Sequence, residues 1–269
     1  MKIKKIAALA LAAILMLCFS ACGESGSPDN MLKVATSPDF APMAFIDTSK
    51  KGQDQYVGFD IMLAKYIAEE MGKELVIQPM SFEACTTAVS MGSVDMAISG
   101  FSWRQDREDN FNLSDFYYAG DNESQQVVIT LKENAGKFNS PEDFKGVKIG
   151  AQTASLQESL CQEQLPDAEI VTIGDLGTGL LQLKNGDFEC MAVAFGQAEV
   201  FMANDESVAL CGFEFEVDEK YTANVVVMKK GADDLTAQVN EILGKAYDSG
   251  VYGEWYKQAK ELAMSATAN

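Results

Sequence analysis

The sequence predicts an α/β fold in which strands and helices alternate and strands pair in parallel. Short apolar segments with the length of buried strands precede segments whose apolar residues recur at helical spacing. Several helical segments stop at a glycine, as at Gly72, Gly92 and Gly186, where helices commonly end. The strand–helix series begins again near residue 147, so the chain carries two such series.

The first series starts with a strand and a β-hairpin, and helices and strands then alternate. In chain order its elements are Leu32–Thr36 (strand), Met43–Ile46 with Gln55–Gly58 (hairpin), Phe59–Met71 (helix), Leu75–Gln78 (strand), Ser81–Met91 (helix), Val94–Ser99 and Gln125–Leu131 (strands). The segment Phe59–Met71 is typical of a helix because its apolar residues recur every three or four positions. Ser81 is a good N-cap for the helix that follows it.

The second series repeats the alternation and ends in two helices. Its elements are Val147–Ala151 (strand), Ser155–Gln164 (helix), Glu169–Ile173 (strand), Leu176–Lys184 (helix), Cys190–Ala194 (strand), Gln197–Ala203 (helix), Val208–Leu210 and Val225–Met228 (strands), Ala232–Asp248 and Tyr252–Leu262 (helices). This periodicity permits either two lobes or one doubly wound domain.

The N-terminus has the pattern of a secretory signal followed by a lipidation site. Three lysines precede an apolar run over residues 6–19, which is short for a membrane span. Phe19-Ser20-Ala21-Cys22 then resembles a bacterial lipobox. We expect residues 1–21 to be removed, Cys22 to carry lipid (palmitate among its acyl chains) and residues 22–30 to form a linker. Plain secretion with cleavage nearby is the alternative.

Charge and cysteine content exclude several classes of protein. The formal net charge of the 269 residues is −19. Removal of three lysines leaves 18 basic and 40 acidic residues, a charge of −22, which disfavours nucleic acid as a partner. The cysteines beyond the lipobox, Cys85, Cys161, Cys190 and Cys211, form no CxxC pair, and the chain has no histidine. We therefore expect buried thiols, with any disulfide pairing left open, no metal and no cofactor.

Residues 95–118 carry the strongest functional signal. A short apolar strand leads into a turn of small polar residues, Ser99, Gly100 and Ser102, and Arg107 follows five residues later. Small residues let a ligand approach the backbone, and a guanidinium can clamp a carboxylate through two parallel hydrogen bonds. The alternative is a solvated arginine on a surface helix.

Three further motifs precede this turn, and the ordered set is more specific than any member. They are Ser37-Pro38-Asp39-Phe40-Ala41-Pro42, Gly58-Phe59-Asp60-Ile61 and Ser81-Phe82-Glu83. From about Leu32 to Leu262 the chain resembles the amino-acid-binding proteins of bacterial ABC importers, in the polar amino-acid class of solute-binding proteins. The resemblance implies an extracytoplasmic protein that delivers a small amino acid or a related carboxylate to ABC permease subunits.

The resemblance also implies the architecture, a two-lobed periplasmic-binding-protein-like fold of type II. Two α/β lobes are joined by a two-strand hinge, and the ligand lies between them at the ends of strands, as in open α/β sheets generally. Lobe 1 is expected to comprise residues 31–121 and 222–269, and lobe 2 residues 122–221.

By resemblance, eight residues are expected to bind the ligand. Arg107 grips the ligand carboxylate beside Ser102, while Ser99 and Gly100 offer a carbonyl or hydroxyl to the ligand amine. Phe40 and Phe82 form aromatic walls, although burial in the core would equally explain a phenylalanine. In the second lobe Ser155 and Leu156 open a helix whose N–H groups favour a carboxylate.

Two positions depart from the family pattern and bear on the ligand. Ala194 stands where an aspartate usually holds the ligand ammonium, and Ser37 where binders of cationic side chains carry an acid. We therefore expect a neutral or polar amino acid, or an amino-acid-like carboxylate, and the weakest binding for basic amino acids. Tight arginine binding would require another acid at the cleft, such as Asp39 or Glu83.

Enzymatic readings are weak, because the chain has no histidine, no Gly-x-Ser-x-Gly and no P-loop. Two alternatives to a transport binding protein remain on the same fold. One is an exported dehydratase-like enzyme, and the other is a surface lipoprotein that presents its ligand to a sensor.

Overall fold

A computed structural model of the chain describes residues 30–118 and 124–266. The predicted signal peptide, Cys22 and most of the linker lie outside these residues. Within the described ranges, no helix combines the length and apolar character needed to cross a lipid bilayer.

The chain forms two five-stranded sheets and a small three-stranded sheet, which confirms the predicted two-lobed α/β fold. The strands are β1 (Met31–Thr36), β2 (Asp39–Phe40), β3 (Ala44–Ile46), β4 (Tyr56–Val57), β5 (Glu74–Pro79), β6 (Met96–Ala97), β7 (Phe111–Leu113), β8 (Gln126–Leu131), β9 (Lys148–Gln152), β10 (Glu169–Ile173), β11 (Cys190–Ala194), β12 (Val208–Glu214) and β13 (Val227–Lys229). The α-helices are α2 (Phe59–Glu70), α3 (Phe82–Met91), α4 (Gln105–Asn110), α5 (Leu156–Gln164), α6 (Leu176–Asn185), α7 (Phe195–Asn204), α8 (Asp233–Ser249) and α9 (Val251–Ala266). Short 3-10 helices cover Gly52–Gln55, Lys132–Lys137, Pro141–Phe144 and Glu219–Tyr221.

Lobe 1 is built on the sheet β5-β1-β6-β13-β7. β1 and β6 pair in parallel, and β13 returns from the end of the chain to pair antiparallel with β6 and β7. Alternate residues point to opposite faces of a strand. Val34 accordingly packs in the core formed with α2, α8 and α9, whereas its neighbour Ala35 packs in the core formed with α3. Both faces of this sheet are therefore covered by helices.

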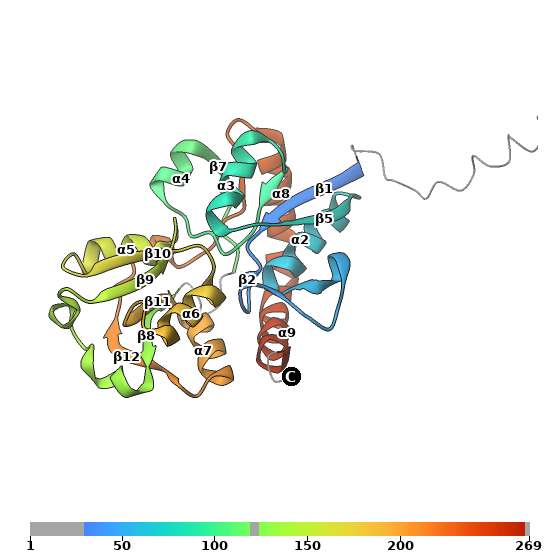
Figure 1. Ribbon diagram of the computed structural model, residues 1–269. Helices are drawn as coiled ribbons and strands as arrows, with labels where there is room; N and C mark the ends of the chain where they lie inside the picture. Colours follow the sequence, from blue (N-terminus) through green and yellow to red (C-terminus); the bar gives the residue numbers. More distant parts are fainter. Residues whose placement is uncertain (1–29, 119–123, 267–269) are drawn as a thin grey trace, which may run out of the picture. The chain divides into compact units, whose positions relative to one another are not determined.

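Lobe 2 is built on the sheet β10-β9-β11-β8-β12. β9 pairs in parallel with both β10 and β11, and β8 runs antiparallel to β11 and β12. Val128 packs with α5 on one face, and Val127 packs with α6 and α7 on the other. In Figure 1 the elements of this lobe, coloured green to orange, form a group of their own.

Two chain segments connect the sheets, one between β7 and β8 and the other between β12 and β13. They run side by side where Tyr117 forms an antiparallel bridge with Asn224, and the Tyr117 N–H donates to the Asn224 carbonyl at 3.0 Å. The exact lobe boundaries at 121/122 and 221/222 stay predictions, since the first falls outside the described residues.

Candidate functional site

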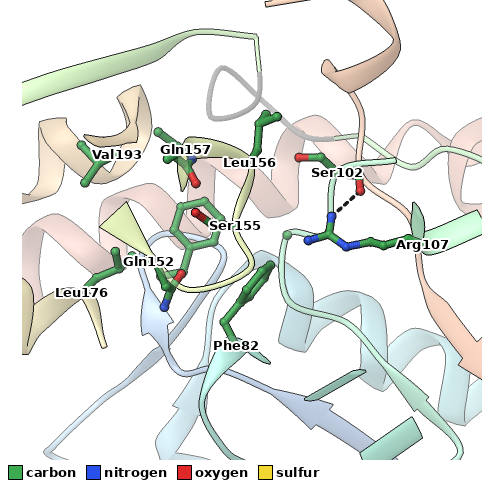
Figure 2. A pocket seen from close by; sticks show the side chains of 12 residues that line it. Phe82, Ser102, Arg107, Gln152, Ser155, Leu156, Gln157, Leu176 and Val193 are labelled. Carbon is green, nitrogen blue, oxygen red and sulfur yellow. Dashed lines mark hydrogen bonds between the residues drawn. The ribbon is translucent and has the colours of Figure 1, made fainter. Parts of the chain in front are cut away.

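A pocket lies where the two lobes meet (Figure 2). Lobe 1 lines the pocket with Phe40, Phe82, Gly100, Ser102 and Arg107, and lobe 2 lines it with Gln152, Ser155, Leu156, Gln157, Leu176, Val193 and Ala194. Seven of the eight residues expected from the sequence are among these twelve; Ser99 is not.

Arg107 is the one charged side chain among the twelve described residues that line this pocket. It lies on α4 and is 5% exposed. Its guanidinium carbon is 5.6 Å from the ring centre of Phe82 and 5.2 Å from that of Phe101. Nη1 donates to the Ser102 carbonyl at 2.6 Å, and Nη2 donates across the lobes to the Ala154 carbonyl at 2.9 Å. The rings and carbonyls thus hold the guanidinium plane in place at the pocket.

The small polar turn after β6 is hydrogen-bonded to the buried carboxyl group of Asp60. The Gly100 N–H donates to Oδ2 of Asp60 at 2.7 Å, and the Tyr117 hydroxyl donates to Oδ1 at 2.9 Å. Asp60 has no solvent exposure, and burial raises its pKa to about 7, although both hydrogen bonds favour the charged form. The N–H of Gly100 is therefore committed inside the protein, which leaves its carbonyl as the backbone group for a ligand.

Ser99 serves the fold rather than the pocket surface. Its side chain is fully buried, and its hydroxyl accepts a hydrogen bond from the Ser37 N–H at 2.9 Å. It ties the end of β1 to the end of β6, and sequence spacing could not distinguish it from Gly100 and Ser102, which line the pocket.

The start of α5 forms part of the pocket in lobe 2. Ser155 is the N-cap, as predicted, and its hydroxyl accepts from the Glu158 N–H at 3.1 Å. Ala154 precedes it with a φ of 63°, a left-handed conformation that is unusual for a residue with a Cβ. Glu158 Oε2 accepts from the Ala154 N–H at 2.7 Å and steadies that turn.

The two aromatic residues expected at the site are buried, and both also line the pocket. Phe40 and Phe82 are 9% and 7% exposed. The ring of Phe82 stacks on Phe101 with the centroids 4.5 Å apart. Contact of either residue with a ligand stays a prediction.

Asp39 brings an acid to the edge of the pocket. Its Oδ2 accepts from the Gln152 side chain at 2.9 Å and from the Leu176 N–H at 2.9 Å, and both of these residues line the pocket. Its Oδ1 accepts from the Ser37 hydroxyl at 2.6 Å. Burial raises the pKa of Asp39, while the bonds from Ser37 and Leu176 oppose that rise. Glu83, the other acid considered, is exposed and lies in a neighbouring groove.

Sequence reasoning missed four lining residues: Gln152, Gln157, Leu176 and Val193. Their signal was their place at strand ends and helix starts, where open α/β sheets bind ligands. Ala194 lines the pocket as well, at the end of β11 and opposite Gln126 of β8. The cysteines Cys85, Cys161 and Cys190 are buried free thiols, as expected, and Cys211 is a half-buried one.

Comparison with known proteins identifies relatives along nearly the whole chain. Residues 32–260 match the profile of the bacterial extracellular solute-binding proteins, family 3. The arginine-binding extracellular protein ArtP of Bacillus subtilis is 30% identical over 257 residues, which cover 92% of this chain and 94% of that protein.

Solved structures agree with this match. An amino acid ABC transporter substrate-binding protein, AbpA of Streptococcus pneumoniae, bound to L-arginine, has a TM-score of 0.79 at 30% identity and covers 88% of this chain and 97% of its own. An ancestral amino acid-binding protein, AncCDT-1, described as a precursor of cyclohexadienyl dehydratase, has a TM-score of 0.72 at 26% identity and covers 86% and 95%.

Proposed function

Because the chain belongs to family 3 of the bacterial extracellular solute-binding proteins, we propose that it captures an amino acid between its lobes for an ABC importer. The observation that carries this proposal is Arg107, a buried guanidinium set at the pocket against the stacked rings of Phe82 and Phe101. A ligand carboxylate would accept hydrogen bonds from this guanidinium, the one charged group among the twelve described lining residues.

The energy available suits a transport binding protein. One hydrogen bond to a charged group contributes about 1.5–3 kcal/mol, and a neutral one about 0.5–1.5 kcal/mol. Two bonds from the guanidinium and two or three neutral bonds can account for micromolar affinity, about −8 kcal/mol, after the cost of ordering the ligand. Ser102 and Ser155 supply hydroxyl groups on opposite sides of the pocket.

The structure changes our expectation about which ligand side chains the pocket accepts. Weak binding of basic amino acids was expected because Ser37 and Ala194 leave the site without an acid. Asp39 removes that ground, since its carboxylate lies one hydrogen bond from the pocket surface. Arginine is bound in the AbpA structure, and ArtP is an arginine-binding protein, so arginine is a ligand to test together with glutamine.

Ligand capture would be coupled to closure of the lobes. Arg107 and Arg104 of lobe 1 donate to the Ala154 and Ser155 carbonyls of lobe 2, at 2.9 and 3.2 Å. A ligand that contacts both lobes favours this closed arrangement and shifts the population toward it. The closed form would then be the one presented to the permease subunits.

We favour a binding protein over a dehydratase. The chain has no histidine, and no acid lines the described pocket, so the groups best suited to move a proton at neutral pH are missing from its walls. A binding protein returns its ligand unchanged after prolonged incubation, whereas a dehydratase consumes it. We propose likewise that the protein works outside the cytoplasm and is anchored by lipid on Cys22.

Isothermal titration calorimetry with arginine, glutamine, histidine and cystine tests the proposal. We expect at least one of them to bind the wild type at micromolar concentration, and Arg107→Ala to weaken that binding about 100-fold or more. Lys245→Ala is the control, because Lys245 is an exposed cation on α8 that does not line the pocket and pairs with Glu70 and Glu241.

Lys245→Ala should change the affinity by about threefold or less, since its exposed pairs with Glu70 and Glu241 contribute little. Melting temperatures of both variants establish that each is folded under the assay conditions. Wild-type affinity in Arg107→Ala, or an equal loss in both variants, contradicts the proposal.

A further inference from the structure

Gln152 lines the pocket, and a residue behind the pocket wall, Asp39, fixes the orientation of its side-chain amide. Its Nε2 donates to Oδ2 of Asp39 at 2.9 Å, and the same oxygen accepts from the Leu176 N–H. The oxygens of an ionised carboxylate only accept hydrogen bonds, so the amide nitrogen of Gln152, and not its oxygen, faces Asp39.

The oxygen of the same amide, Oε1 of Gln152, is therefore the atom that can accept a hydrogen bond from a ligand in the pocket. Gln152 is 7% exposed, and over residues 30–118 and 124–266 its Oε1 makes no hydrogen bond. Figure 2 shows the side chain at the lobe 2 side of the pocket. This oxygen can therefore accept a hydrogen bond from a donor on a ligand in the pocket.

A second glutamine of the pocket lining, Gln157, has its amide held by another amide. Its Nε2 donates to Oε1 of Gln126 at 2.6 Å. Gln126 is fully buried and sits directly opposite Ala194 in the β8–β11 pairing. A glutamine pair therefore stands beside the position where the family pattern has an aspartate, and the carbonyl oxygen of Gln157 is its acceptor toward the pocket.

We propose that Asp39 and Gln126 are positioning residues that turn the carbonyl oxygens of Gln152 and Gln157 into the pocket. The inference rests on the proposed function and names its ligand class: an α-amino acid whose side chain carries N–H donors. The ammonium donates to Gln157 and the side chain to Gln152, while Arg107 holds the carboxylate. Glutamine and arginine fit this frame; glutamate and a deaminated analogue each leave one carbonyl without a donor.

The first experiment measures the glutamine-to-glutamate affinity ratio by calorimetry at pH 7. We expect the wild type to prefer glutamine at least about tenfold. Asp39→Leu removes the acceptor, lets the Gln152 amide turn its nitrogen toward glutamate, and should bring the ratio close to one. Asp39→Asn retains an oxygen that can accept from both Gln152 and Leu176, so the ratio should stay within about threefold of the wild type.

Glu83→Gln is the matched control, because Glu83 is an exposed acid near Phe82 but outside the pocket. It should leave both affinities unchanged. Gln152→Met keeps the length of the side chain without its oxygen and guards against misfolding of Asp39→Leu. It should weaken glutamine about 2- to 10-fold and spare glutamate.

The second experiment compares glutamine with its deaminated analogue, glutaramate, in the wild type and in Gln126→Leu. Loss of the Gln126 oxygen should lower the preference for glutamine about 2- to 10-fold, without reducing glutaramate binding. Unchanged ratios in Asp39→Leu, Gln152→Met and Gln126→Leu overturn the inference while leaving amino acid binding intact. A wild type that binds none of these probes overturns the proposed function itself.

Discussion

The buried carboxyl of Asp60 should make the stability of this protein fall as the pH rises toward neutrality. Asp60 has no solvent exposure, and its only titratable partner among the described hydrogen bonds is the Tyr117 hydroxyl at 2.9 Å. Burial raises the pKa of Asp60 from 3.8 to about 7. The folded protein therefore holds this proton more tightly than the unfolded chain does.

The size of the effect follows from the shift in pKa. A rise of about three units at 1.36 kcal/mol each corresponds to about 4 kcal/mol. This penalty is absent below pH 3.8, grows between pH 3.8 and 7, and is constant above pH 7. Asp60→Asn removes the ionisation and retains an oxygen for the Gly100 N–H. The free energy of unfolding of the variant should therefore increase relative to that of the wild type as the pH rises.

Urea unfolding followed by tryptophan fluorescence, at intervals between pH 4 and 8, measures the difference. Groups that titrate in both proteins cancel when the two free energies of unfolding are subtracted. Asp47→Asn is the control, because the hydrogen bond from Ser49 lowers the pKa of Asp47 from 3.8, so the difference in stability between this variant and the wild type should stay constant from pH 4 to 8. A difference between Asp60→Asn and the wild type that does not change from pH 4 to 8 refutes the reasoning.

Three further changes have expected outcomes. Ala154→Gly should raise the free energy of unfolding by about 0.5–1 kcal/mol in urea titrations. The left-handed conformation costs an L-residue about 1–2 kcal/mol, and the larger conformational entropy that glycine loses on folding offsets part of this gain. Ala194→Asp should strengthen glutamine binding about tenfold in calorimetry by pairing the ammonium, and should not help glutaramate. Cys22→Ala should move the protein from the membrane fraction to the medium or periplasm, and unchanged membrane retention contradicts the lipid anchor.

The order of elements could be predicted because local pattern and tertiary packing agree over most of the chain. The strands Glu169–Ile173 and Cys190–Ala194 have the predicted bounds, since each is an apolar run between a helix end and a polar turn. β7 was missed because its three residues are half-buried and its pairing partner, β13, comes more than a hundred residues later. β6 is shorter than predicted because pairing is limited to Met96 and Ala97.

The candidate site was predicted best where a motif carried it. The turn from Gly100 to Arg107 lines the pocket because the end of β6 points there. Gln152 and Gln157 gave no comparable signal, since a glutamine near a helix start usually faces water. Their position depends on Asp39 and Gln126, which are 113 and 31 residues away along the chain. Such contacts arise only when the lobes and strands have assembled.

A crystal structure of the protein grown with the amino acid that binds best tests the central claim most directly. The account predicts the ligand in the pocket between the lobes, with its carboxylate about 2.7–2.9 Å from the guanidinium nitrogens of Arg107. Its ammonium should face Gln157 and its side chain Gln152. A ligand whose carboxylate lies away from Arg107, or one bound outside this pocket, would contradict the account.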